Sequence, residues 1–454
     1  MKKLSEKPLI IDAVIVLKAN SGIKILGLPI LHRIILSAYQ AGIKNFLLLG
    51  KAGIEEKDLV RSLKEDRRIK SKEIQIDYWS LPDNIAENTV SAKIESGHNF
   101  WLISGEVVIL EKALALNPSS AGIWQQPLIL TAEKKLIPTA TPSAPCLIIC
   151  PNFIWPALVE SWKAGQIDDQ TWLIAWLLKQ YSARVDEIAE DWLIKINSVA
   201  DRKKAITALL QTARKPQDGF IARHFNRRIS LFFTRYLASL KISPTFLSVL
   251  NFLIGLSGAV LCALGKNYFF FLAGAFLFEF SSIFDGCDGE VARLTYQTSE
   301  KGGLADVIFD ALTYILFFSA LAVGLYRNRQ NTIFLWLLGL FLGSISWYYF
   351  NLYHFSKSSG IGNKIFLLAK EVEAQGKKSQ NVRLTDRLAA KLAFALRRDF
   401  FATMVFLTIA LNLSSFLLYL VVIGSLMEST YVHFFRSRQV ENNCPENQAS
   451  LDLT

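Results

Sequence analysis

The feature that most limits the fold of this 454-residue chain is a series of apolar segments that begins after Pro244. Most of them are about 20 residues long, the length at which an α-helix crosses the hydrocarbon core of a bilayer. With 51% hydrophobic and 20% charged residues, the composition is that of an integral membrane protein rather than a soluble one. We predict an all-α domain of six transmembrane helices, near residues 246–265, 268–287, 304–326, 333–354, 399–413 and 415–435.

The basic residues indicate how these helices are oriented. The formal net charge is +11, and Lys and Arg are dense before residue 246 and over residues 357–398. Because cytoplasmic loops are enriched in Lys and Arg, we expect a multi-pass protein of the inner (cell) membrane with its amino-terminal domain and its carboxyl terminus in the cytoplasm. Arg327 and Arg329, on the predicted outer side, are a minor departure. Anionic lipid accounts for the positive charge, so we expect membrane lipids and no nucleic acid as partners.

The first half of the chain follows a different pattern, in which short β-rich runs alternate with helical stretches. This alternation is typical of α/β layers around a mostly parallel sheet, a Rossmann-like arrangement. The expected strands are 13–17, 46–49, 74–79, 100–104, 127–130 and 146–150. We expect an α/β domain over 1–211, a basic amphipathic helix on the membrane surface over 212–243, the membrane domain over 244–436 and a disordered polar tail over 437–454. A solvated linker helix is the alternative for 212–243.

Four aspartates lie where the second predicted helix ends and the third begins. Asp285 and Asp288 are in one helix, and Asp306 and Asp310 follow at four-residue spacing in the next. This spacing places each pair on one helix face, so two antiparallel helices would bring four carboxylates together. Clustered anions near hydrocarbon need a cation, and oxygen ligands without His or Cys favour Mg²⁺ or Mn²⁺ over zinc. We expect a two-metal site of the kind that supports phosphoryl chemistry.

The complete pattern is D-x-x-D-G-x-x-A-R, eight residues, then G-x-x-x-D-x-x-x-D. It resembles the signature of the CDP-alcohol phosphatidyltransferase family, and every specified position matches. The resemblance implies transfer of a phosphoryl-alcohol group from a CDP-alcohol donor to the hydroxyl of an alcohol or alcohol-phosphate acceptor, with release of CMP. It implies that Asp310 is both the catalytic base and a metal ligand. The other implied metal ligands are Asp285, Asp288 and Asp306, and the implied nucleotide-binding set is Gly289, Ala292, Arg293 and Gly302.

Two further segments resemble the branch of this family that makes inositol phosphodiesters. They are 218–227, with Asp218 and Arg223, and Arg397-Arg398-Asp399. An acceptor that carries a phosphate needs cations, and guanidinium groups bind phosphate through two parallel hydrogen bonds. Arg397 and Arg398 are therefore candidates for binding the acceptor phosphate, and the alternative is that they anchor the chain at the membrane surface. We also expect a homodimer.

The amino-terminal domain resembles the sugar-phosphate nucleotidyltransferase family at 13–17, 27–31 and 41–43. In some proteins such a domain precedes this membrane domain as a cytidylyltransferase. The family's triphosphate loop is rich in glycine, whereas residues 18–24 contain only Gly22. The aspartate expected after the central strand is Glu106, and a later acidic pattern has Asn197 in place of an aspartate. We therefore expect a degenerate nucleotidyltransferase-like domain that serves regulation, substrate delivery or structural support.

Other functions are open beside this interpretation. One is a bifunctional enzyme whose first domain makes the CDP-alcohol. Another is a non-catalytic membrane scaffold, which would have no reason to keep all four aspartates in register. A transporter with an acidic cation site is a third, but transporters usually hold carboxylates near the bilayer midplane on interrupted helices. In this sequence the aspartates lie at helix ends.

Overall fold

The computed structural model describes residues 12–51, 53–81, 99–114, 126–131, 145–163, 170–214, 225–240, 242–358 and 398–442. The chain divides into two compact units. The first is Met1–Ala213 with two short segments, Arg235–Lys241 and Leu294–Tyr296, and the second is the remainder. Each unit has its own hydrophobic core.

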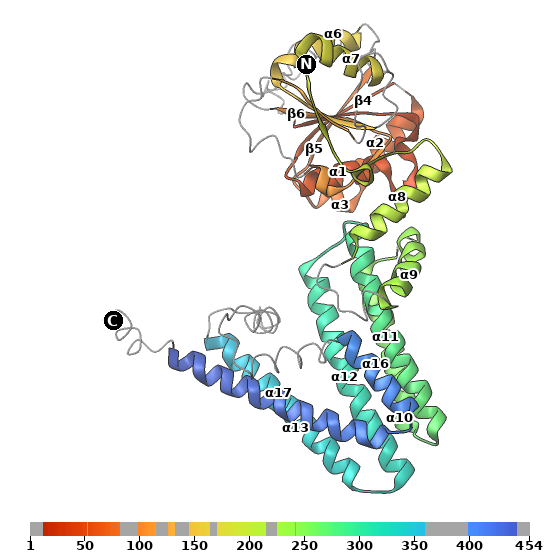
Figure 1. Ribbon diagram of the computed structural model, residues 1–454, viewed down its shortest axis with the longest axis vertical. Helices are drawn as coiled ribbons and strands as arrows, with labels where there is room; N and C mark the ends of the chain where they lie inside the picture. The colour runs from red at the N-terminus through yellow and green to blue at the C-terminus, as the bar shows by residue number, and fades with distance from the viewer. Residues whose placement is uncertain are drawn as a thin grey trace, which may run out of the picture. The chain divides into compact units, whose positions relative to one another are not determined.

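A seven-stranded sheet forms the centre of the first unit (Figure 1). Its spatial order is β10 (Arg184–Glu187), β8 (Leu128–Thr131), β9 (Cys146–Cys150), β6 (Phe100–Ser104), β1 (Ala13–Val16), β4 (Asn45–Lys51) and β5 (Gln75–Leu81). Neighbouring strands are parallel except where β9 is one of the pair. The six predicted strands and the mostly parallel α/β sheet are confirmed. The edge strand β10 lacks an apolar signal in the sequence because three of its four residues are charged.

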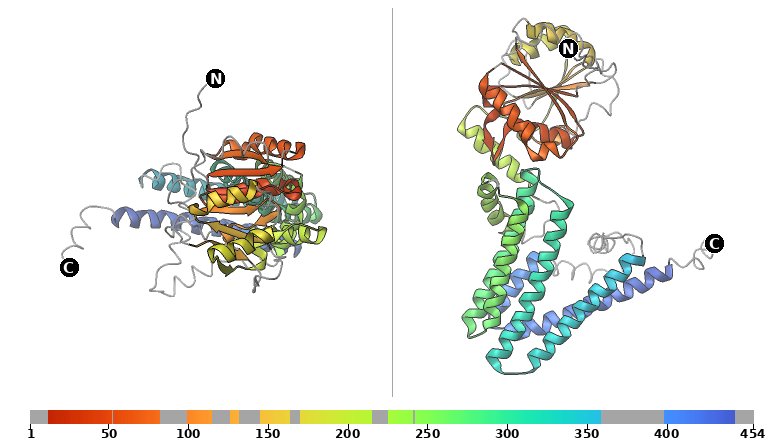
Figure 2. Two further views of the ribbon diagram at one scale, coloured as in Figure 1. Left: turned by 90° about the horizontal axis from the view of Figure 1, so that it is seen from above. Right: turned by 180° about the vertical axis from the view of Figure 1, so that it is seen from behind.

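Helices cover both faces of this sheet (Figures 1 and 2). On the face that carries α6 and α7, Trp155 and Leu158 pack against strand residues such as Val14 and Phe100. Because the central strands β1, β4, β6, β8 and β9 are buried on both faces, their sequences are continuous apolar runs rather than alternating ones. The helices are α1 (Ile30–Gln40), α2 (Ile54–Glu65) and α3 (Arg67–Lys70) on one face, and α6 (Trp155–Lys163) and α7 (Gln170–Tyr181) on the other. The remaining elements are the short strands β2 (Lys24–Ile25), β3 (Leu28–Pro29), β7 (Val107–Ile109) and β11 (Leu193–Lys195), the short helix α5 (Glu111–Leu114) and the longer helix α8 (Val199–Thr212).

A buried arginine, Arg33, stabilises the first unit through backbone carbonyl groups. Its side chain donates to the carbonyl oxygens of Ile25 at 2.7 and 2.9 Å, Leu26 at 3.2 Å and Leu294 at 2.9 Å. A buried cation is costly unless its N–H groups are satisfied, and several carbonyl oxygens satisfy those of Arg33. The bond to Leu294 attaches the short segment Leu294–Tyr296, which belongs to this unit.

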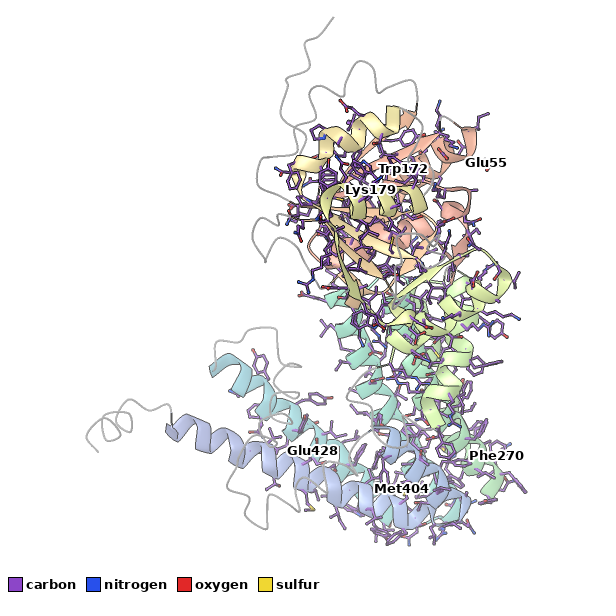
Figure 3. All side chains as sticks on the ribbon, turned by 45° about the horizontal axis from the view of Figure 1, so that its top comes forward. Glu55, Trp172, Lys179, Phe270, Met404 and Glu428 are labelled. Carbon is purple, nitrogen blue, oxygen red and sulfur yellow. The ribbon has the colours of Figure 1, made fainter. Side chains whose placement is uncertain are left out.

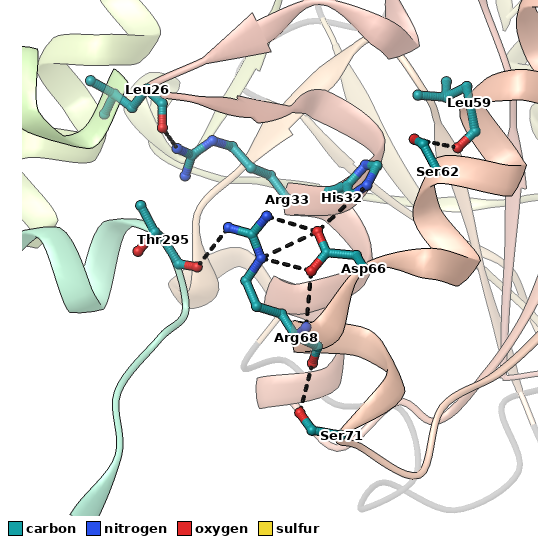
Figure 4. Close-up of polar contacts among 9 residues, drawn as sticks. All are labelled: Leu26, His32, Arg33, Leu59, Ser62, Asp66, Arg68, Ser71 and Thr295. Carbon is teal, nitrogen blue, oxygen red and sulfur yellow. Dashed lines mark hydrogen bonds and ion pairs between the residues drawn. The ribbon is translucent and has the colours of Figure 1, made fainter. Parts of the chain in front are cut away.

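A second polar cluster lies nearby, around Asp66 (Figure 4). Arg68 Nη2 lies 2.7 Å from Asp66 Oδ2, and Arg68 Nη1 donates to the Thr295 carbonyl at 3.4 Å. Burial alone would raise the pKa of Asp66, but the hydrogen bonds from Arg68 outweigh it and hold that pKa below its ordinary value. His32 Nε2 is 3.7 Å from Asp66 Oδ2, and burial lowers the pKa of His32 to about 4. The imidazole is therefore neutral at pH 7, and its contact with Asp66 is not an ion pair there.

The described residues of the second unit are almost entirely helical. Figures 1 and 2 show α10, α11, α12 and α16 side by side, and α13 runs along α17. The carboxyl-terminal helix α17 ends within the segment expected to be a polar tail. The helices are α9 (Arg227–Ser239), α10 (Pro244–Leu264), α11 (Tyr268–Leu294), α12 (Glu300–Arg329), α13 (Ile333–Ser358), α16 (Arg398–Ala410) and α17 (Ser414–Asn442).

Within the described residues, four helices are long and apolar enough to cross a membrane: α10, α11, α12 and the Ile333–Asn351 part of α13. The predicted fifth and sixth spans are also helical, but their apolar stretches, Phe400–Ala410 and Ser414–Thr430, are shorter. The second of these stretches contains Glu428, labelled in Figure 3. The structure therefore confirms a helical region with four span candidates among the described residues, and the six-span topology stays a prediction.

Small residues let three of these helices approach closely. A Cβ atom on Gly258 of α10 would lie 2.8 Å from the carbonyl oxygen of Gly274 on α11. A Cβ atom on Gly324 of α12 would overlap the carbonyl oxygen of Cys262 on α10. Backbone therefore packs against backbone, as is common between membrane helices. This packing sets the relative positions of the helices that carry the aspartates.

Candidate metal and nucleotide site

The motif aspartates lie on either side of the connection between α11 and α12. Asp285 and Asp288 are toward the end of α11, and Asp306 and Asp310 are toward the start of α12. Helix α12 begins after Ser299, whose hydroxyl accepts a hydrogen bond from the Gly302 amide at 3.0 Å. Both Asp306 and Asp310 therefore lie within the regular part of α12, and their four-residue spacing places them on one face of the helix.

Three of the four carboxylates converge directly. One oxygen each from Asp285, Asp306 and Asp310 lies within 4.8 Å of the other two, and all three residues are half-buried. Asp288 is more deeply buried and interacts with both Asp285 and Asp306. The structure thus brings together all four aspartates that the sequence pattern singled out.

Helix α10 adds two polar side chains that the sequence analysis missed. Ser248 Oγ donates to Asp288 Oδ2, and Asn251 Nδ2 donates to Asp285 Oδ1 at 3.4 Å. Both residues are buried, and their three-residue spacing places them on one face of α10. A signal for them exists in the sequence, because they are polar residues one turn apart in an otherwise apolar segment. Gly255, the next residue on that face, allows the close approach of Thr313 on α12.

These residues fit a divalent metal that prefers oxygen ligands. Three half-buried carboxylates within 4.8 Å repel one another unless a cation lies among them. Next to these carboxylates, among the residues that the structure describes, Asn251 has a buried Oδ1 with no hydrogen-bond partner. An all-oxygen set suits Mg²⁺ or Mn²⁺. The side chains that would hold the metal are those of Asp285, Asp288, Asp306 and Asp310.

The predicted nucleotide-binding residues follow the first aspartate pair. A Cβ atom on Gly289 would lie 3.3 Å from Arg293 Nη1, so the Arg293 side chain covers this glycine. Ala292 is buried, and Gly302 is half-buried in the first turn of α12. Small residues at these positions add little bulk beside the helix backbone. Their role in nucleotide binding stays a prediction.

The structure does not describe the side chains of the predicted acceptor-phosphate arginines. Arg397 lies outside the described residues, and Arg398 is the first residue of α16. Their contact with a phosphate group therefore also stays a prediction.

In the first unit, the position that the nucleotidyltransferase resemblance assigns to a metal-binding aspartate is already compensated. Glu106 Oε1 lies 3.0 Å from Lys195 Nζ, and both side chains are partly buried. Antiparallel pairing of β7 with β11 sets Lys195 opposite Val107 and so brings its side chain to Glu106. The Lys195 ammonium group thus supplies the positive charge that the Glu106 carboxylate would otherwise need from a metal cation.

The loop over residues 18–24, which corresponds to the family's triphosphate loop, is also held by contacts within the protein. Asn20, in the 3₁₀ turn Ala19–Gly22, donates to the Ile196 carbonyl at 2.8 Å. Ser21 packs so closely on Gly105 that a Cβ atom there would overlap its hydroxyl. The loop that the resemblance assigns to triphosphate binding is therefore anchored at Ile196 and Gly105.

The later acidic position is used as a helix cap. The Asp201 carboxylate accepts hydrogen bonds from the amides of Asn197 at 3.1 Å and Ser198 at 2.8 Å, at the start of α8. The Ser198 hydroxyl and these amides hold the pKa of Asp201 below its ordinary value. Asp201 therefore stabilises the helix terminus.

Comparison with known proteins identifies the second unit. Residues 241–427 match the CDP-alcohol phosphatidyltransferase family, a range that contains every residue of the aspartate motif. The carboxyl-terminal half contains a CDP-alcohol phosphatidyltransferase domain. The match to this family and the four membrane-span candidates together indicate a membrane protein.

Curated relatives share part of the chain. The protein named bifunctional IPC transferase and DIPP synthase from Archaeoglobus fulgidus is 36% identical over 137 residues, which are 30% of this chain and 26% of the relative. The protein of the same name from Aquifex aeolicus is 33% identical over 171 residues, or 37% of this chain and 38% of the relative. The chain thus spans between about a quarter and two fifths of these relatives' length.

Solved structures resemble the α/β sheet. The 4-diphosphocytidyl-2C-methyl-D-erythritol synthase of Anaerococcus prevotii is similar with a TM-score of 0.33 and 12% sequence identity. The superposition covers 44% of this chain and 98% of that one.

Proposed function

We propose that this protein is a membrane-bound phosphotransferase that moves a phosphoryl-alcohol group from a CDP-alcohol to an acceptor hydroxyl and releases CMP. The observation that carries the proposal is the convergence of the Asp285, Asp306 and Asp310 carboxylates within 4.8 Å. This cluster lies inside a CDP-alcohol phosphatidyltransferase domain. Its oxygen ligands suit Mg²⁺ or Mn²⁺, the cations that usually accompany a pyrophosphate.

The residues divide the chemistry between donor and acceptor. When bound, divalent cations would neutralise the donor pyrophosphate and stabilise the charge on the leaving phosphate. Asp310 would take the proton of the acceptor hydroxyl, whose oxygen forms a bond to the phosphorus that carries the donor alcohol. The bond from that phosphorus to the bridging oxygen of the pyrophosphate breaks, and CMP leaves with the electron pair.

Other side chains would position the two substrates. The nucleotide would be held by Gly289, Ala292, Arg293 and Gly302. Arg397 and Arg398 would bind a phosphate group on the acceptor. We further propose a homodimer in the inner (cell) membrane with the amino-terminal domain and the carboxyl terminus in the cytoplasm, a topology supported by the distribution of Lys and Arg.

We also propose that the first unit does not make the CDP-alcohol and instead serves regulation, substrate delivery or structural support of the membrane domain. The ion pair between Glu106 and Lys195 and the anchored loop at Asn20 support this. The second candidate is a bifunctional enzyme with an active first unit. The names of the relatives favour it, since both are called bifunctional.

The proposed transferase activity is tested by CMP release from the full-length protein, purified in detergent and supplied with Mg²⁺. CDP-diacylglycerol and CDP-inositol serve as donors, each with and without alcohol and alcohol-phosphate acceptors. We expect release that requires both substrates and that is lost in Asp306→Asn. The exposed Glu300, at the start of the same helix, provides the matched control Glu300→Gln, which should retain activity. Equal release by wild type and Asp306→Asn would contradict the proposed site, and no release with any donor would contradict the function.

A further inference from the structure

Helix α9 presents two different faces. Arg227, Ser230 and Thr234 are buried and, at positions i, i+3 and i+7, share one face. Ile229 and Phe232 on the other face are exposed, at 40% and 58%. The buried face of α9 thus carries three polar side chains beside the apolar Leu231, and these polar groups require a polar partner inside the protein.

That partner is the carboxylate of Glu290 on α11, which is completely buried. Arg227 Nη1 and Ser230 Oγ donate to Glu290 Oε1 at 2.6 and 2.8 Å, and Thr234 Oγ1 donates to Oε2 at 2.6 Å. Three donors and one positive charge thus compensate a carboxylate that has no access to water. Such a charge tolerates little displacement, because movement away from Arg227 would leave it desolvated without its counter-charge.

Glu290 occupies one of the unspecified positions of the aspartate motif, directly after Gly289. The same contact between helices continues at Gly286, where a Cβ atom would lie 2.8 Å from Arg227 Nη1. It also includes Cys287, whose Sγ lies 3.5 Å from the Ser230 carbonyl oxygen. Helix α9 therefore packs against Gly286, Cys287 and Glu290, which lie next to Asp285 and Asp288 in the sequence of α11.

The end of α11 is thus held from two sides. Ser248 and Asn251 of α10 bind the two aspartates themselves, and α9 binds the intervening face. Contacts on two faces restrict rotation of the helix about its axis as well as sliding along it. Both motions would move Asp285 and Asp288 relative to Asp306 and Asp310.

We propose that Arg227, acting through Glu290, is a positioning residue that sets the rotation and depth of the aspartate pair on α11. The proposal rests on the proposed metal-dependent function of the site. It assigns α9 a role in forming the metal site through its contacts with Glu290. Groups that hydrogen-bond to metal ligands typically change metal affinity by about ten- to a hundred-fold when replaced, and this sets the scale for the effect expected here.

The test compares Mn²⁺ affinity with stability in the full-length protein. Arg227→Met with Glu290→Gln removes both charges together, so no buried charge is left unpaired and Ser230 and Thr234 still have an acceptor. Mn²⁺ binding is measured by electron paramagnetic resonance, and thermal unfolding is measured on the same preparations. We expect Mn²⁺ to bind the double variant at least about tenfold more weakly while the unfolding temperature stays close to that of wild type.

Two single variants complete the experiment. Arg228 is the exposed neighbour of Arg227 on α9, so Arg228→Met is the matched control and should bind Mn²⁺ as wild type does. Arg227→Lys keeps the charge but not the guanidinium geometry, and it should retain stability with an intermediate affinity. If the double variant does not fold, Arg227→Lys decides the test.

The outcomes separate this proposal from the one on which it rests. Wild-type Mn²⁺ affinity in the folded double variant, or in Arg227→Lys where that variant decides, would overturn the positioning role. A lower unfolding temperature with unchanged affinity would also overturn it, because it would leave Arg227 a purely structural role. Failure of the wild-type protein itself to bind Mn²⁺ would instead contradict the proposed metal site.

Discussion

Mild acid should destabilise the first unit through one buried histidine. Burial lowers the pKa of His32 to about 4 from its ordinary 6.5, and the nearby Asp66 only partly offsets this. Below pH 6.5 the unfolded chain therefore binds a proton at this residue, while the folded chain stays neutral until about pH 4. A difference of one in pKa corresponds to about 1.36 kcal/mol. The lowering of the His32 pKa from 6.5 to about 4 therefore corresponds to about 3 kcal/mol of folding free energy that is lost as the pH falls through this range. About 2 kcal/mol of this stability is lost between pH 7 and pH 5.

Urea unfolding followed by tryptophan fluorescence measures this effect in the full-length protein. Eight of the ten tryptophans precede residue 213, so the signal reports on the first unit. His32→Gln removes the titrating ring, and His32→Leu serves if the glutamine variant does not fold. We expect the variant to lose about 2 kcal/mol less free energy of unfolding than wild type between pH 7 and pH 5. His354→Gln, in α13 of the second unit, is the matched control and should follow wild type.

The comparison has a clear contrary result. Between pH 7 and pH 8 the two proteins should show nearly the same pH dependence, because His32 is then neutral in the folded chain and mostly neutral in the unfolded chain. If wild type and variant also lose equal free energy between pH 7 and pH 5, His32 is not held neutral in the folded state. The argument from burial would then be wrong.

Three further predictions concern the site, the first unit and the topology. Asp310→Asn should lower CMP release by about a hundredfold or more, with less effect on donor binding measured by calorimetry. Asp285→Asn should instead weaken Mn²⁺ binding and CDP-alcohol binding together. If Asp310→Asn keeps near-normal turnover but loses donor binding, the catalytic base is another residue. The full-length protein should not release pyrophosphate from CTP and an alcohol phosphate, and robust release would support the bifunctional alternative. Labelling from outside the cell should reach a cysteine placed at Asn328 and not one placed at Gln375, and the opposite pattern would reject the orientation.

The sequence by itself determined the features that depend on local periodicity. Asp285 and Asp288 share a face of one helix, and Asp306 and Asp310 share a face of the next. Because the two helices follow each other along the chain, helical spacing was enough to predict that the four side chains meet. The central strands were predictable for a similar reason, since strands buried on both faces are continuous apolar runs.

Other features became visible only in the tertiary structure. Glu290 stands at an unspecified position of the motif, and its partner Arg227 lies 63 residues earlier. Glu106 is compensated by Lys195, which only the pairing of β7 with β11 brings near. The physical reason is the same in both cases. The environment of a buried charge depends on which distant element packs against it, and local periodicity carries no information about that choice.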